Sequence, residues 1–172
     1  SEIDFMHQAA DFKYYENGDT KAVKLPYENG LSMVVVLGDT KNILNDIHNN
    51  KMTSKLVDVS LPKFKAEYSI DYVNILKNMG IEKAFDNQNA DFSLMLENYP
   101  ERIKIDSVLQ KAMIDVDEKG TEAAAATVAV LTKSALSVDE EVIEFRADKP
   151  FTYYILDDNG NVYFAGRYVK AE

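Results

Sequence analysis

Residues that could support acid–base chemistry or bind a metal ion are few in this chain and widely separated. The two histidines, His7 and His48, lie 41 residues apart, and no cysteine is present. Disulfides, thiol nucleophiles and Cys-type zinc sites are therefore excluded, and we interpret both histidines as solvated or core-capping side chains rather than metal ligands or general bases. Asp106, Asp115 and Asp117 line a strand-like segment. Asp115 and Asp117 share one face of it, which we interpret as a solvated face rather than a catalytic carboxylate pair.

Motifs that bind phosphate or activate a nucleophile are also missing from the sequence. The glycines of "ENG" and "DNG" are typical of hairpin turns, not of a phosphate-binding loop, and there is no Gly-x-Ser-x-Gly motif. The net charge of −10 argues against nucleic acid or an anionic membrane as a partner. No apolar run approaches the ~18 residues of a membrane-spanning helix. We therefore predict a protein that is not an enzyme, uses no cofactor or metal and has no membrane segment.

The unusual part of the sequence is "GTEAAAATVAVLTKSAL", residues 120–136, which contains four consecutive alanines. Its composition fits an ordinary helix that begins after Gly120, or a plain loop. It also fits a strand, because alternate residues would then form an uncharged face that could enter a packed sheet. That face would consist of Thr121, Ala123, Ala125, Thr127, Ala129 and Leu131. The opposite face would carry a single charge, at Glu122, followed by Ala124, Ala126, Val128, Val130 and Thr132.

The elements around this stretch are predicted to be mostly strands, within one domain. We expect two hairpins over residues 11–37, with turns at "NGDT" and "ENG", and with Pro26 indicating an edge strand or a kink. A short helix after a Thr40 cap, a long strand bent at Pro62 and a helix ended by Gly80 follow. A second long strand is expected over residues 101–120, and three strands near the end include a final hairpin around "DNGN". The pattern predicts an α+β fold dominated by sheets.

Several segments resemble the serpin family of serine protease inhibitors. The segment "VLQKAMIDVDEKGTEAAAAT" is similar to the serpin hinge, and "FRADKPFTYYI" is a second specific match. Further similar segments occur in the family's order: "MHQ", "LPY", "LSMVVVLGD", "LPKFK", "MGIEKAF", "ADFS" and "NVYFAGR". The resemblance covers essentially the whole chain. Because serpins are about twice as long, it implies a C-terminal half, a partial domain over residues 1–172 that lacks the N-terminal half of the fold.

The resemblance also implies a mechanism and its site. Serpins present a reactive loop, here about residues 118–141, to a protease, which cleaves it and is held as an acyl-enzyme while the hinge inserts into a sheet. The hinge residues implied are Glu118, Gly120, Thr121, Glu122, Ala123, Ala124, Ala125, Ala126 and Thr127. A non-inhibitory serpin-fold binding protein and an inactive incomplete fragment are the alternatives. The resemblance further implies an extracellular or cell-surface location.

The sequence allows two positions for the cleaved bond. The family's usual spacing from Glu118 places it after Ser134, before Ala135, which suits an elastase-like protease. A spacing one residue shorter places it after Lys133, which suits the acidic specificity pocket of a trypsin-like protease. The family usually has a histidine where this chain has Gln110. Glutamine can donate and accept a hydrogen bond but takes no charge, so we expect no pH-dependent opening at that position.

Overall fold

The computed structural model describes residues 4–95, 103–118 and 141–169. The chain divides into two compact units, which are considered separately. Unit 1 comprises Ser1–Phe64 and Val116–Glu172, and unit 2 comprises Lys65–Asp115.

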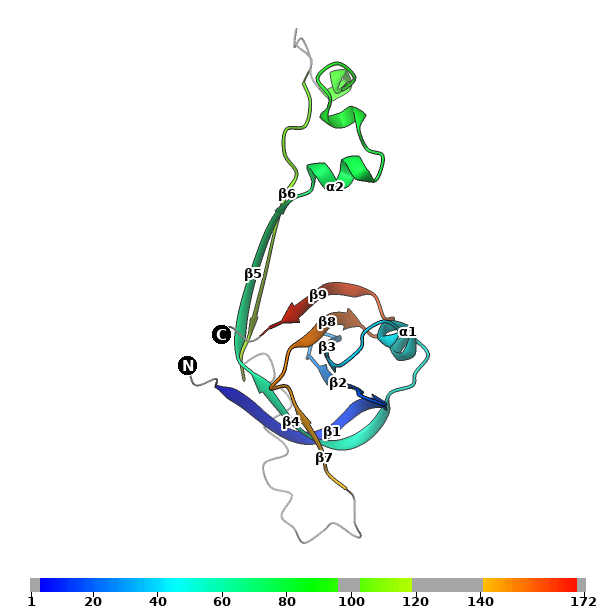
Figure 1. The fold of residues 1–172 in the computed structure, drawn as a ribbon, viewed down its shortest axis with the longest axis vertical. Coiled ribbons are helices and arrows are strands. Elements are labelled where there is room, and N and C mark those ends of the chain that lie inside the picture. Colours follow the sequence, from blue (N-terminus) through cyan, green and yellow to red (C-terminus); the bar gives the residue numbers. More distant parts are fainter. Residues whose placement is uncertain (1–3, 96–102, 119–140, 170–172) are drawn as a thin grey trace. The chain divides into compact units, whose positions relative to one another are not determined.

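Unit 1 is built on a seven-stranded sheet with the order β7-β4-β1-β2-β3-β8-β9 (Figure 1). Its elements are β1 (Phe5–Asn17), β2 (Thr20–Pro26), β3 (Leu31–Leu37), α1 (Ile43–His48), β4 (Thr53–Pro62), β7 (Ile143–Arg146), β8 (Phe151–Asp157) and β9 (Val162–Tyr168). All neighbouring strands are antiparallel except β4 and β7, which are parallel. The predicted hairpins are confirmed.

The long strand β1 links the two parts of this sheet. Its first ten residues, Phe5 to Tyr14, pair with β4, and its last five, Lys13 to Asn17, pair with β2. The β1–β2 turn places Gly18 at φ 57°, a left-handed conformation that glycine adopts without a steric cost. Strand β2 lies between β1 and β3, so of the two possibilities expected for Pro26, an edge strand or a kink, the edge strand was wrong. Pro26 is the last residue of β2, where the missing N–H has little effect on the ladder.

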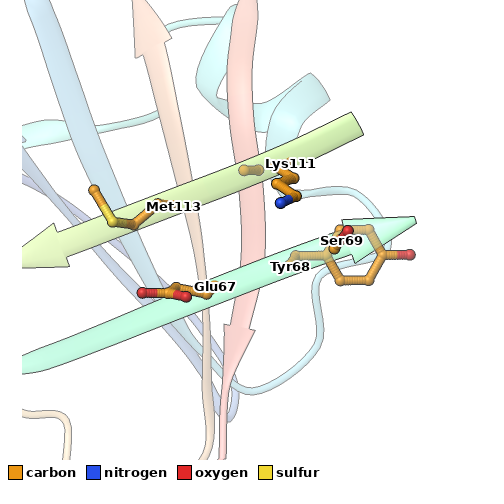
Figure 2. A pocket seen from close by; sticks show the side chains of 6 residues that line it. Glu67, Tyr68, Ser69, Lys111 and Met113 are labelled. Carbon is orange, nitrogen blue, oxygen red and sulfur yellow. The ribbon is translucent and has the colours of Figure 1, made fainter. Parts of the chain in front are cut away.

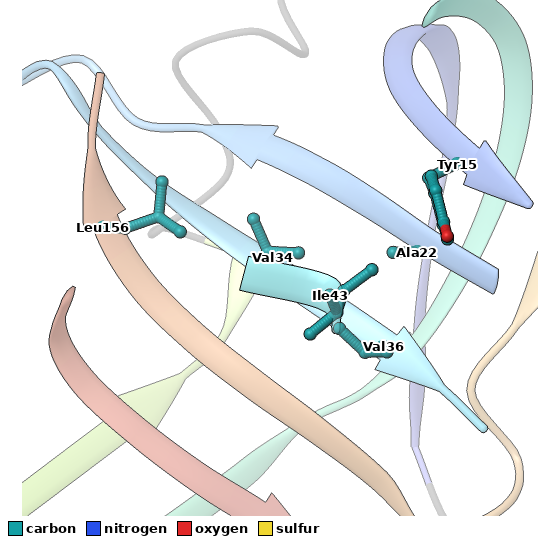
Figure 3. Close-up of a cluster of buried hydrophobic side chains, with 6 residues drawn as sticks. All are labelled: Tyr15, Ala22, Val34, Val36, Ile43 and Leu156. Atoms are coloured by element: carbon teal, nitrogen blue, oxygen red, sulfur yellow. The ribbon is translucent and has the colours of Figure 1, made fainter. Parts of the chain in front are cut away.

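Helix α1 covers part of one face of the sheet through Ile43. In Figure 3, Ile43 lies among side chains from β1, β2, β3 and β8, which form a buried cluster of Tyr15, Ala22, Val34, Val36 and Leu156. The residue before the helix is Asn42, and its side chain makes no capping hydrogen bond, so the predicted Thr40 cap was wrong. A capping side chain is dispensable here because burial of Ile43, which is 2% exposed, fixes the helix to the sheet.

A buried carboxylate is satisfied at the edge of this cluster. The Tyr15 hydroxyl donates a hydrogen bond of 2.6 Å to Asp46 of α1, and the Lys51 ammonium lies 2.7 Å from the other carboxylate oxygen. The Lys51 ammonium, together with the Tyr15 hydroxyl, lowers the pKa of Asp46 below its ordinary value. The network holds α1 against the end of β1. Separating them would leave the buried Asp46 carboxylate unpaired, which costs free energy.

Unit 2 contains all but one end residue of each strand of a two-stranded sheet, β5 (Phe64–Asp71) and β6 (Leu109–Val116), whose arrows point in opposite directions in Figure 2. Between these strands the chain forms α2 (Val73–Asn78) and two short 3-10 helices, η1 (Lys83–Phe85) and η2 (Ser93–Met95). The predicted helix before Gly80 is confirmed, and Gly80 has a left-handed φ of 93°. The bend predicted at Pro62 is also confirmed, since β4 ends there and β5 begins at Phe64. The second long strand was predicted too long: residues 103–108 are not strand.

A substitution in the short parallel strand β7 can test where the core of unit 1 lies. Phe145 is fully buried opposite Val59 of β4. We predict that Phe145→Ala lowers the free energy of unfolding by about 3–5 kcal/mol, because it removes a large buried side chain and leaves a cavity. The measurement is a denaturant unfolding curve of the complete polypeptide that contains these residues. Phe164→Ala is the matched control, since Phe164 of β9 is 45% exposed; equal losses in the two variants would contradict the assignment of the core.

Candidate functional site

The residues predicted from the sequence to form the reactive site fall mostly outside the described part of the chain. The candidate cleavage residues Lys133, Ser134 and Ala135 lie outside it, as do the hinge residues Gly120, Thr121, Glu122, Ala123, Ala124, Ala125, Ala126 and Thr127. Glu118, the first predicted hinge residue, is described. The structure therefore describes only the two ends of the candidate site. Glu118 is at its start, and β7 follows its end.

An ion-pair cluster around Lys63 holds the first end. Lys63 lies between β4 and β5, and its ammonium is 2.5 Å from the Glu118 carboxylate and 2.8 Å from the Asp4 carboxylate. The Lys63 backbone N–H also donates a 3.0 Å hydrogen bond to the Asp4 carbonyl. Three segments that are distant in the sequence thus meet at one cation, and we call Asp4, Lys63 and Glu118 the hinge cluster.

The electrostatics of the hinge cluster favour the charged forms. The hydrogen bond from Lys63 is the main cause that lowers the pKa of Glu118 below its ordinary value. The hydrogen bonds to Asp4 and then Glu118 raise the pKa of Lys63. The contribution of Glu118 to stability is thus fully present above the ordinary glutamate pKa and is lost as the pH falls through the lowered value. The contribution of Lys63 is present below the ordinary lysine pKa and is lost as the pH rises through the raised value.

The second end of the candidate site is held by the same part of β4. Arg146 ends β7 opposite Ser60, and the Ala147 N–H donates a 2.9 Å hydrogen bond to the Ser60 carbonyl. The Arg146 guanidinium lies 5.5 Å from the centre of the Phe5 ring, which is cation–π geometry. Residues Ser60 to Lys63 of one strand end therefore contact the chain on both sides of residues 119–140.

The two histidines lie on different elements of unit 1. His7 lies on β1, and its Nδ1 is 3.0 Å from the Ser60 hydroxyl; His48 is an exposed residue at the end of α1. Across residues 4–95, 103–118 and 141–169, no group of three His, Cys, Asp or Glu side chains could hold a metal ion. In the same residues, no helix is long and apolar enough to cross a membrane.

A surface hollow lies at the two-stranded sheet of unit 2. An open hollow of about 500 Å³ is lined by Glu67, Tyr68 and Ser69 of β5 and by Lys111, Ala112 and Met113 of β6 (Figure 2). Tyr68 and Met113 are both more than half exposed. Gln110, which stands where the family usually has a histidine, is also exposed on β6. Among the described residues, β6 has one strand neighbour, β5, so its other edge has free backbone groups.

Sequence reasoning missed Asp4 and Lys63. Lys63 contacts Asp4, 59 residues earlier in the sequence, and Glu118, 55 residues later. A long-range ion pair leaves no periodic pattern in a single sequence. The available signal was the bend at Pro62, which places the next side chain at the corner between two strands.

Comparisons with known proteins agree on one family. The model of the family described as "Serpin (serine protease inhibitor)" matches residues 1–171. An uncharacterized serpin-like protein of Thermococcus kodakarensis is 37% identical over 96% of this chain and 41% of its own length. The antitrypsin of Bombyx mori is 31% identical over 98% of this chain and 46% of its own length. The solved structure of Serpin48 from Tenebrio molitor has a TM-score of 0.70 and 31% identity, over 99% of this chain and 46% of that one.

These matches confirm the predicted β-rich fold of the family. The chain spans about half the length of the curated relatives it matches, 41% and 46% for the two above. That share agrees with the prediction of a half-length match. The loop boundaries and the cleavage residues stay predictions.

The contacts of the hinge cluster predict how the pKa of Glu118 changes when Lys63 is replaced. We expect Lys63→Gln to raise the pKa of Glu118 towards its ordinary value, because the ammonium that stabilises the carboxylate is removed. The measurement is an NMR titration of the Glu118 carboxyl carbon in the complete polypeptide. Lys21→Gln is the control, since Lys21 pairs with Glu16, 3.5 Å away, and should leave Glu118 unchanged. An unchanged Glu118 pKa in Lys63→Gln would show that the ion pair does not form in solution.

Proposed function

Because this chain belongs to the serpin family, we propose that it forms the reactive-loop half of a serine protease inhibitor and acts together with the N-terminal half of the serpin fold. The protease cleaves the reactive loop, about residues 118–141, becomes covalently attached, and is inactivated when the hinge inserts into the sheet that contains β5 and β6. The antitrypsin among the relatives supports the inhibitory class.

The observation that carries this proposal is the free edge of β6. In the part of the chain described by the structure, β6 pairs with β5 alone. Residues 121–131, whose alternate side chains would form an uncharged face, follow β6 in the sequence after a few residues. A segment that turns back after Glu118 would lie antiparallel to β6 and complete its ladder, and antiparallel neighbours can be joined by a short turn. The sequence that could become a strand is thus next to an edge that can accept one.

The chemical step is an acyl transfer. The serine hydroxyl of the protease attacks the carbonyl carbon of Lys133 or Ser134, and its proton passes through the protease histidine to the leaving amine. The peptide bond breaks, and Ser134 or Ala135 becomes a new N-terminus. An ester now joins the protease to the chain that ends at Lys133 or Ser134. Inhibition requires that insertion precede hydrolysis of this ester.

Insertion gains free energy from backbone hydrogen bonds and from burial of one face of the inserted segment. Twelve residues in a strand span about 40 Å, at roughly 3.4 Å per residue, so the attached protease would be carried across a domain. Residues 120–136 contain no proline, which would remove a ladder hydrogen bond. The face that starts at Thr121 contains no charge and avoids the cost of burying an ion.

We also propose the partners and location implied by this mechanism. Cleavage after Lys133 fits a trypsin-like protease, and cleavage after Ser134 fits an elastase-like protease. We further propose that the inhibitor acts outside the cell or at its surface, as the family resemblance implies.

A second candidate, that this stretch of chain is inactive without its other half, rests on the exposed apolar side chains of unit 2. Met79, Leu94 and Met95 are each at least 73% exposed. Large exposed apolar side chains together with free strand edges favour association. A non-inhibitory serpin-fold binding protein is the remaining alternative, and stability before and after loop cleavage distinguishes it, since only insertion raises stability strongly.

The alternating faces of residues 121–131 give a matched pair of variants. We predict that Ala125→Arg abolishes the covalent complex with protease and turns the protein into a substrate, because arginine on the inserted face meets the cost of burying a charge. Ala124→Arg lies on the opposite face, which already carries Glu122, and is expected to retain complex formation. The measurement is intact-mass spectrometry of the complete polypeptide after brief exposure to trypsin or elastase.

The same spectra identify the cleaved bond. A covalent adduct with a released peptide that begins at Ser134 or Ala135 supports the proposal and fixes the bond. Clean cleavage by both proteases without any adduct in the unmodified protein contradicts it. An equal loss of adduct in both arginine variants would contradict insertion of the Thr121 face.

A further inference from the structure

The hinge cluster contains one cation and two carboxylates from different segments. Lys63 contacts Glu118, at the start of the predicted hinge, and Asp4, at the start of the described chain. Their environments differ. Asp4 is also fixed by its backbone, because its carbonyl accepts the 3.0 Å hydrogen bond from the Lys63 N–H, and the next residue, Phe5, pairs with Pro62 of β4. Glu118, by contrast, is the first residue of the predicted hinge, which moves in the proposed mechanism.

We propose that Asp4 is a positioning residue that competes with Glu118 for Lys63 and replaces it as the counter-ion when the hinge moves, so that Asp4 speeds release of the hinge. The inference rests on the proposed function for its effect on inhibition. The competition itself rests on the geometry of the hinge cluster alone.

The charge arrangement supports competition rather than cooperation. Both carboxylates lie within 2.8 Å of the same ammonium, so each reduces the attraction available to the other. The negative charge of Asp4 acts on the pKa of Glu118 in the opposite direction to Lys63 and raises it. Without Asp4, Lys63 would hold Glu118 more tightly, and movement of Glu118 would leave the ammonium without either carboxylate.

The expected size of the effect follows from exposure. The side chains of Asp4 and Glu118 are 74% and 51% exposed, so water and salt weaken both contacts. Exposed ion pairs of this kind alter an equilibrium or a rate by roughly two- to fivefold. That range is measurable in the competition between insertion and hydrolysis of the acyl-enzyme, because both start from the same intermediate.

The test compares Asp4→Asn, Glu118→Gln and the double variant in the complete polypeptide, with trypsin as the probe. We measure the ratio of inhibitor cleaved to inhibitor found in covalent complex. We expect Asp4→Asn to raise this ratio about two- to fivefold, since slower release of the hinge favours hydrolysis. In the Glu118→Gln background the same change should have no effect, because no carboxylate remains for Asp4 to displace. Asp158→Asn is the control: Asp158 is 81% exposed and pairs with Lys24 at 3.2 Å.

A second readout is independent of inhibition. In an NMR titration of the Glu118 carboxyl carbon, Asp4→Asn should lower the pKa of Glu118, because a nearby negative charge is removed, and Asp158→Asn should leave it unchanged. An unaltered pKa of Glu118 in Asp4→Asn would overturn the competition. An unaltered or smaller cleavage ratio in Asp4→Asn, or the same increase in the Glu118→Gln background, would overturn the role of Asp4 in release. If the unmodified protein forms no complex with trypsin or elastase, the proposed function fails, and the titration alone decides whether Asp4 competes for Lys63.

Discussion

The last residues of β4 determine where the chain on either side of residues 119–140 is attached. The Ser60 carbonyl accepts a hydrogen bond from the N–H of Ala147, the residue after β7. Lys63, three residues after Ser60, forms an ion pair with Glu118. The ten-residue register between β1 and β4 supports this strand end, and Phe5 and Asp4 add contacts to Arg146 and Lys63. The two attachments differ in strength. The β7 side is held by the fully buried Phe145, whereas the Glu118 side is held by an exposed ion pair. The side that must move in the proposed mechanism is the weaker one.

The two units also differ in how completely their apolar surfaces are covered. In unit 1, Val23, Val34, Val35 and Val36 are fully buried, and Val34 and Val36 lie in the cluster that contains Ile43 of α1. In unit 2, by contrast, no residue of α2 is buried, and the hollow beside Tyr68 and Met113 is open. A two-stranded sheet with a free edge can still accept a strand. This contrast is consistent with a function in which unit 1 holds the loop ends and the sheet of unit 2 receives the hinge.

The sequence predicted most of the elements of this fold because their signals are local. The turns at Gly18 and Gly30 and the helix stop at Gly80 require left-handed backbone, and all three glycines adopt it. The predicted bend at Pro62 is also confirmed. The edge-strand possibility for Pro26 was wrong, because a proline at the last position of a central strand gives the same signal as one in an edge strand. The hinge cluster could not be predicted, since the contact between Lys63 and Glu118 depends on tertiary structure and leaves no pattern in the sequence. The family resemblance pointed to Glu118 as a hinge residue, but not to the residues that hold it.

The central claim of this account is that residues 121–131 become a strand beside β6 after the loop is cleaved. Hydrogen exchange of the backbone amides in the complete polypeptide, before and after cleavage at Lys133 or Ser134, tests it most directly. The account predicts that these amides exchange rapidly before cleavage and become as protected as those of β6 afterwards, because they then donate to a sheet ladder. Rapid exchange of residues 121–131 after cleavage, with β6 unchanged, would contradict insertion.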